Sequence, residues 1–155
     1  MHFIVELGFT YTEAGYYIDY PPDATLFLDN SIGLDYSEAI ISFSRSVDET
    51  GVVMEIFTDL NKENKSLDQF AHEGINRICN GQPPKVNGII IINTSIIEGH
   101  SALTFNSIPN SPIVFIESRD RFYELILMRN MMIGNTPTND AVDLFYKILI
   151  TFTIL

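Results

Sequence analysis

Three carboxylates, Asp29, Glu55 and Glu117, stand at the ends of predicted strands and could take part in metal chemistry. Carboxylates from adjacent strands can hold Mg²⁺, and a nearby lysine can steady the phosphate or the attacking water of a nuclease. A Glu-x-Lys on a strand would support such a site, but residues 55–57 read Glu-Ile-Phe and residues 117–119 read Glu-Ser-Arg. The lysine is missing at both places, so a metal-dependent nuclease stands as an alternative interpretation.

The other chemically capable groups form no recognised pattern. His2, His72 and His100 are far apart, and none lies in a His-Glu-x-x-His pattern, which disfavours a metal site. Residues 99–102 read Gly-His-Ser-Ala and lack the glycine after the serine that a nucleophile elbow needs. The single cysteine, Cys79, is expected to pack as a small hydrophobe, and neither glycine-rich phosphate-binding pattern occurs. We therefore expect no enzyme active site, no cofactor and no metal.

Acidic residues are concentrated in the amino-terminal half. The 155-residue chain has 20 Asp and Glu against 9 Lys and Arg, a formal net charge of −11. Residues 1–77 hold 14 carboxylates and 4 basic side chains, whereas residues 78–155 hold 6 and 5. A field of one sign attracts a basic partner and repels nucleic acid and anionic membrane. Solubility alone is the competing explanation of the charge.

Aromatic residues share this acidic segment, and aromatic side chains ringed by charge are typical of the hot spots of protein interfaces. We therefore predict a surface that binds a basic protein. Its predicted electrostatic contacts and aromatic anchors are Glu13, Asp19, Asp23, Asp29, Asp35, Tyr11, Tyr17 and Tyr20.

The patterning predicts one domain, residues 1–155, of the α/β or α+β class. Strands over 3–9, 16–20 and 25–28 are expected to form an antiparallel amino-terminal meander. Further strands are predicted over 52–57, 88–92 and 112–116. The last two are continuous apolar runs and are expected to be central strands, covered on both faces.

Four helices are predicted. Residues 35–38 and 66–69 have the form of capping boxes, which indicates helices over about 36–48 and from Ser66 to just before Gly81. Two more are predicted over 119–133 and from Asn139 onward. The expected architecture is a mixed β-sheet with the meander and about four helices packed on it.

The longest apolar stretch, 144–155, is too short to span a membrane and contains Lys147. It is predicted to be a buried terminal helix or strand. If it is exposed instead, the apolar patch is expected to be an interface of a homo-oligomer. No secretory signal is recognised, and a single cysteine fits a reducing compartment, so a cytoplasmic protein is expected.

A small acidic chain of this kind, rich in isoleucine and asparagine and without a catalytic motif, resembles the immunity proteins of bacterial toxin–immunity systems, including contact-dependent growth inhibition. The resemblance implies a cytoplasmic inhibitor that binds the basic toxic domain of a partner, frequently a nuclease, and blocks its active-site cleft. The same physics fits a phage-type DNA mimic that occupies a defence nuclease.

The succession of residues 88–93, a loop and residues 112–117 is similar to the core of restriction-endonuclease-like proteins. This likeness implies the nuclease alternative, in degenerate or active form. A net charge of −11 lacks the basic footprint that a nucleic-acid enzyme uses, so we favour the inhibitor.

Overall fold

The computed structural model describes residues 7–12, 14–20, 24–29, 36–43, 53–97, 99–106, 111–128 and 139–155. Within them lie two antiparallel sheets and two helices, an α+β arrangement. The elements, in chain order, are β1 (Leu7–Tyr11), β2 (Tyr16–Tyr20), β3 (Ala24–Asp29), β4 (Tyr36–Phe43), β5 (Val53–Leu60), α1 (Leu67–Ile78), β6 (Asn93–Ile97), β7 (His100–Asn106), β8 (Pro112–Glu117), β9 (Arg121–Met128), α2 (Asn139–Leu149) and β10 (Thr153–Ile154). The strand order is β3-β4-β5-β9-β8-β7-β6 in the large sheet and β1-β2-β10 in the small one.

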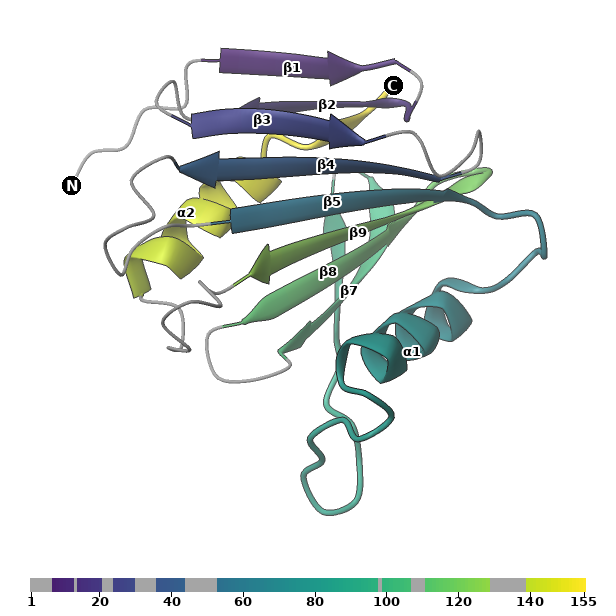
Figure 1. Cartoon of the computed structure of the whole chain (residues 1–155). Coiled ribbons are helices and arrows are strands. Elements are labelled where there is room, and N and C mark those ends of the chain that lie inside the picture. Colours follow the sequence, from purple (N-terminus) through teal and green to yellow (C-terminus); the bar gives the residue numbers. More distant parts are fainter. Residues whose placement is uncertain are drawn as a thin grey trace.

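The large sheet separates two hydrophobic cores, and α1 lies against one face of it (Figure 1). The core under α1 joins the helix to β7, β8 and β9. The second core lies on the opposite face and includes side chains of β1, β2 and α2. Strands β8 and β9 therefore face both cores, and their side chains alternate between them.

The α1 helix is confirmed, together with its predicted start. The Ser66 hydroxyl accepts a hydrogen bond from the Gln69 backbone N–H at 3.1 Å, and the Gln69 side chain accepts one from the Ser66 N–H at 2.9 Å. This capping box satisfies two backbone donors that a helix start leaves open. The helix ends at Ile78, and Gly81 follows in a left-handed conformation, with φ of +76°.

Two of the four predicted helices are strands instead. Residues 36–43 form β4, in which Ala39 and Ile41, two positions apart, are both buried. Burial at every second residue is the period of a strand, and it prevails here over the local capping-box signal for a helix. Residues 121–128 form β9, whose apolar run is continuous because both faces are covered. Such a run cannot be told from a buried helix by its period alone.

The predicted central strand over 88–92 is also wrong. Asn87 and Gly88 have φ of +53° and +80°, and Val86 and Ile89 bridge across them, which makes a tight hairpin turn. The strand that follows, β6, is an outer strand of the large sheet rather than a central one. The second predicted central strand, 112–116, is confirmed as β8.

The amino-terminal meander is only a hairpin. β1 and β2 pair with each other, but β3 leaves them and pairs with β4 in the large sheet. The third strand of the small sheet is β10, from the carboxyl-terminal end of the chain. The predicted helix from Asn139 is confirmed as α2, and every pairing between described strands is antiparallel, so the large sheet is not mixed.

A glycine and a buried ion pair dock α1 on the sheet. A Cβ added at Gly74 would lie 2.5 Å from Oε1 of Glu124 and 2.6 Å from Cε1 of Phe115, so only glycine permits this approach. Glu124 is 1% exposed and accepts hydrogen bonds from the Arg77 guanidinium at 2.9 Å to both of its oxygens. Arg77 itself lies largely at the surface, so the pair joins a buried carboxylate to a solvated cation.

Substitution of Gly74 by alanine should destabilise the protein. The added methyl group overpacks the contact, at a cost of about 1–3 kcal/mol, which outweighs the gain of roughly 1 kcal/mol in helix propensity. Urea denaturation should show a lower midpoint for Gly74→Ala. The control is Asn76→Ala on the exposed side of the same helix, which should be neutral or slightly stabilising; equal effects of the two substitutions would contradict the tight contact.

Glu124→Gln should change how stability depends on pH. Burial raises the pKa of Glu124, and the nearby Arg77 charge offsets only part of this shift. A raised folded-state pKa means that the carboxyl group stabilises most when protonated, and that this contribution is lost as the pH rises from about the ordinary value of 4.5 through the raised one. The stability of Glu124→Gln relative to wild type should therefore increase over this interval.

The measurement is urea denaturation of both proteins between pH 4 and pH 8. Glu117→Gln, at a partly exposed carboxylate, is the matched control. A stability of Glu124→Gln that falls relative to wild type as the pH rises would refute the assignment.

Candidate functional site

Strands β3, β4 and β5 carry acidic residues and no lysine or arginine. The strand register places Asp29 opposite Glu38, and Glu38 opposite Phe57. On β5, Glu55 and Asp59 lie two residues before and two residues after Phe57. Positions opposite each other in register share a face of a sheet, as do positions two apart along one strand. These four acidic positions therefore belong to one face, which we call the acidic face: Asp29, Glu38, Glu55 and Asp59.

The acidic face lies on the same side of the large sheet as α1 but beside the helix. The helix contacts β7 and β8, and the core beneath it extends to β9. Figure 1 shows β3, β4 and β5 side by side beyond the helix. The side chains of Glu55, Phe57 and Asp59 are partly exposed, in contrast to Met54, Ile56 and Thr58 on the other face of the same strand, which are buried. Acidic positions that share one face of a sheet concentrate negative charge on that face.

Apart from Tyr11, the sequence-predicted contacts divide into three groups. Asp29 belongs to the acidic face. On β2, Tyr17 and Asp19 are partly exposed, whereas Tyr20 lies on the other side of the strand and packs, partly buried, against the core. The Tyr17 hydroxyl donates a hydrogen bond to Asp19, which holds the pKa of this tyrosine above its ordinary value. Three predicted contacts lie outside the described residues: Glu13, Asp23 and Asp35.

Tyr11 was predicted as a surface anchor, and this is wrong. Its side chain is 3% exposed and lies in the core on the α2 side of the sheet. Its ring centroid is 5.7 Å from that of Tyr16, whose ring in turn lies 5.8 Å from Tyr123 and 5.2 Å from Phe152. The alternation along β1 turns Tyr11 inward, and these rings close the core beneath the hairpin.

The three carboxylates of the nuclease alternative do not converge. The register runs from Glu117 on β8 through β9 to Asp59 on β5, so Asp29 on β3 lies four strands away from Glu117. Four strand spacings amount to about 19 Å, far beyond what one or two metal ions can bridge. Within the described residues, no group of three or more Asp, Glu, His or Cys side chains could hold a metal ion.

The cysteine and one histidine have structural surroundings. Cys79 is partly buried against the core under α1, and burial raises the pKa of its thiol, which keeps the sulfur in the weakly nucleophilic protonated form. Nδ1 of His72 lies 2.8 Å from the carbonyl oxygen of Asp68 within α1. Neither side chain has the arrangement of a nucleophile with its base.

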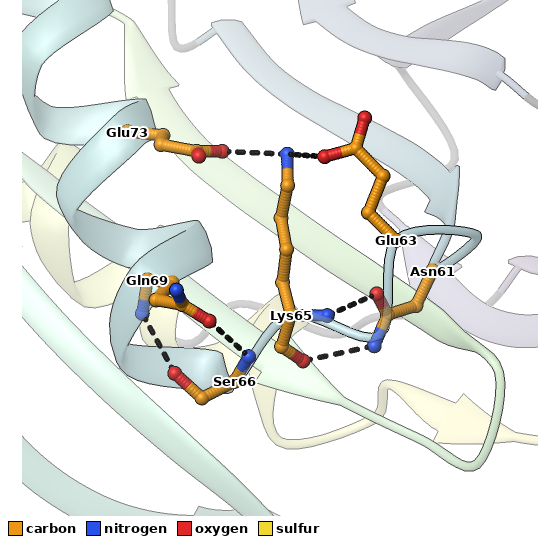
Figure 2. Close-up of polar contacts among 6 residues, drawn as sticks. All are labelled: Asn61, Glu63, Lys65, Ser66, Gln69 and Glu73. Atoms are coloured by element: carbon orange, nitrogen blue, oxygen red, sulfur yellow. Dashed lines mark hydrogen bonds and ion pairs between the residues drawn. The ribbon is translucent and has the colours of Figure 1, made fainter.

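A polar cluster that the sequence did not suggest joins β5 to α1 (Figure 2). Nζ of Lys65 lies 2.8 Å from Glu73 and 3.3 Å from Glu63, and its hydrogen bond to Glu73 is the main cause of its raised pKa. Asn61 fixes the loop, because its side chain bonds both the N–H and the carbonyl of Lys65, at 2.8 and 3.0 Å. Lys65 is therefore a permanently charged structural cation rather than a general base.

Beside this cluster lies a hollow of about 170 Å³. It is lined by the stacked and buried rings of Phe70 and Phe122, whose centroids are 4.3 Å apart, and by Asp59 of the acidic face. Residues of the β5–α1 connection complete the lining. The hollow thus lies between the acidic face and α1.

Comparisons with known proteins identify a fold but no family. No protein-family profile matches the sequence, and no curated protein matches it. The structure is similar to the solution structure of cyanobacterial PsbP (CyanoP) from Synechocystis sp. PCC 6803, with a TM-score of 0.62 and 10% sequence identity. The match covers 96% of this chain and 92% of the other, so the likeness extends over the whole fold. Neither of the two described helices combines the length and the apolar character that crossing a membrane requires.

The placement of the tyrosines predicts opposite effects of two substitutions. Tyr11→Ala should lower the free energy of unfolding by about 3–5 kcal/mol, because it empties a buried aromatic site. Tyr17→Ala, at a partly exposed position of the same hairpin, should cost clearly less. Thermal or urea denaturation measures both, and similar losses would contradict the assignment of Tyr11 to the core.

Proposed function

We propose that this chain is an immunity protein: a stoichiometric inhibitor that binds the basic toxic domain of a partner, of the nuclease class, in the cytoplasm. The observation that supports the proposal is the acidic face, on which three adjacent strands bring together four acidic positions and no basic residue. A nuclease binds phosphates through a basic cleft, and carboxylates at fixed positions can occupy the same cleft.

The position of these residues on strands favours tight binding. Side chains on a sheet lose less conformational freedom on association than those on a loop, so less of the interaction energy is spent on ordering. Complementary charge also accelerates encounter, from a neutral rate of about 10⁵–10⁶ M⁻¹s⁻¹ to 10⁸ M⁻¹s⁻¹ or more at low salt. Phe57, partly exposed between Glu55 and Asp59, adds an aromatic contact of the kind that interfaces use as an anchor.

Lys65, one of two lysines in the β5–α1 connection, has its charge offset by neighbouring carboxylates. Lys65 is held between Glu63 and Glu73, so two carboxylates already offset its charge. These three residues together carry a charge of −1, and Lys62 of the same connection adds a positive charge beside the hollow.

Charge reversal on the acidic face tests the proposal. The double variant Glu38→Lys/Glu55→Lys should associate with the partner at least tenfold more slowly at low salt, because it inverts the central charges of the face. The control is Asp120→Lys/Asp143→Lys, which changes the net charge equally at two exposed positions outside the face. Association is measured with the product of the neighbouring gene at 20 and 500 mM salt, beside that protein's nuclease or toxic activity.

The proposal requires that the wild-type chain and the control abolish the partner's activity at one-to-one stoichiometry, and that the face variant does not. Equal slowing by both double variants would reduce the effect to net charge. Lack of any complex with a basic protein would overturn the immunity function.

A further inference from the structure

The outer strand β6 has features of an uncovered sheet edge. Among the strands that the structure describes it pairs only with β7, so no described strand bonds the backbone N–H and C=O groups on its other side. All of its residues except Ile97 are exposed. Proteins usually protect such an edge with a charge, a proline or a bulge, since a bare edge pairs with other chains. The sequence of β6, Asn-Thr-Ser-Ile-Ile, contains neither a charge nor a proline.

The segment that leads into β6 is uncharged and apolar as well. No charged residue occurs between Lys85 and Glu98 in a chain whose net charge is −11. Four of the large hydrophobic side chains that the described residues expose belong to this segment: Val86, Ile89, Ile91 and Ile96. Ile96 is 75% exposed and lies on β6 itself. An exposed apolar surface of this kind beside a bare edge is typical of an interface.

We propose that β6 is a homodimerisation edge, which pairs antiparallel with β6 of a second copy of this chain. Two copies that each carry −11 repel one another, and an uncharged end is the place where they can approach most closely. A basic protein, by contrast, is attracted to the acidic face at the other end of the sheet. The edge therefore fits a copy of the same neutral segment.

The symmetry of the pairing favours a closed dimer. Two identical antiparallel strands are related by a twofold axis, so residue i of one copy pairs with residue j of the other and j with i. The edge of each copy is then fully paired, and no further copy can add to it. The other edge of the large sheet, β3, carries Asp29 and belongs to the acidic face. Pairing of β6 with β3 of the next copy would be head-to-tail and would continue from copy to copy without closing. It would also bring no opposite charges together, because β6 is uncharged.

This dimer goes beyond the proposed inhibitor function and is independent of it. Strands β9, β8 and β7 separate β5 from β6, so the acidic face of each copy lies in the part of the sheet that is remote from the dimer axis. The two large sheets would become one continuous sheet with an acidic face near each end. A dimer would therefore present two binding faces for two partner molecules.

Light scattering after size exclusion tests the proposal with the full chain. The wild type should shift from 17.5 kDa towards twice that mass as its concentration rises from 5 to 500 μM. Ile96→Lys places a charge at the edge and should raise the dimer dissociation constant at least tenfold. The matched control is Ile150→Lys, since Ile150 is 70% exposed but follows α2, and it should dimerise as the wild type does.

Cross-linking provides a second readout that does not depend on a loss of binding. In a Cys79→Ala background, single cysteines are introduced at Thr94, Ser95 and Ile96, and one of these positions should lie on the twofold axis and form an intermolecular disulfide under mild oxidation. Ser101→Cys, exposed on the next strand inward, is the control that should form no intermolecular disulfide. A wild type that remains at 17.5 kDa at 500 μM, or cross-linking at Ser101 equal to that on β6, would overturn the proposal. Dimerisation lost in Ile150→Lys rather than in Ile96→Lys would place the interface at the carboxyl-terminal end instead, which also overturns it.

Discussion

One helix cannot cover a seven-stranded sheet, and much of this structure follows from that constraint. An α-helix is about 10 Å wide and strands are spaced by about 4.8 Å, so α1 covers little more than two or three strands. It packs over the half of the large sheet that contains β7, β8 and β9. The same side of β3, β4 and β5 lies beyond the helix, and by register it carries the four acidic positions together with Phe27, Ile40 and Phe57. The acidic positions thus lie on the part of the sheet that α1 does not cover.

The docking of α1 determines where the covered half ends. Gly74 brings the helix close enough for Phe115 to fill the space beneath it, and Arg77 reaches over the edge to the buried Glu124. In register, Glu124 is opposite Phe57, so this ion pair lies at the boundary between the core and the acidic face. Burial of a carboxylate lowers the stability of the fold unless a cation pairs with it. Here the pairing cation is supplied by the helix itself, which ties its position to the sheet.

The parts of the fold that local sequence could predict are those with local hydrogen bonds. The capping box of Ser66 and Gln69 involves residues three apart, and α1 begins where it indicates. β4 and β9 were predicted as helices because what makes them strands is their pairing with distant segments, such as Glu55 with Ile126. The acidity of the site was predictable from composition. Its geometry was not, because Asp29 and Glu38 become neighbours only through the β3–β4 register, and because Tyr11 faces the core through the alternation of a hairpin that the sequence placed in a larger meander.

The small sheet joins the first strand pair of the chain to its last residues. β10 pairs with β2, the backbone N–H of Asp19 bonds the Thr151 hydroxyl at 2.9 Å, and Leu155 N–H bonds the carbonyl of Gly15 at 2.9 Å. Contacts across more than 130 residues are slow to form, because the loop they close is long. During synthesis at roughly 5–20 residues per second, the amino-terminal hairpin waits on the order of 10 s for its third strand. Until then the side chains that β2 buries against α2 and Phe152 have no cover, which makes the nascent chain, rather than the finished protein, the form most exposed to aggregation and to chaperones.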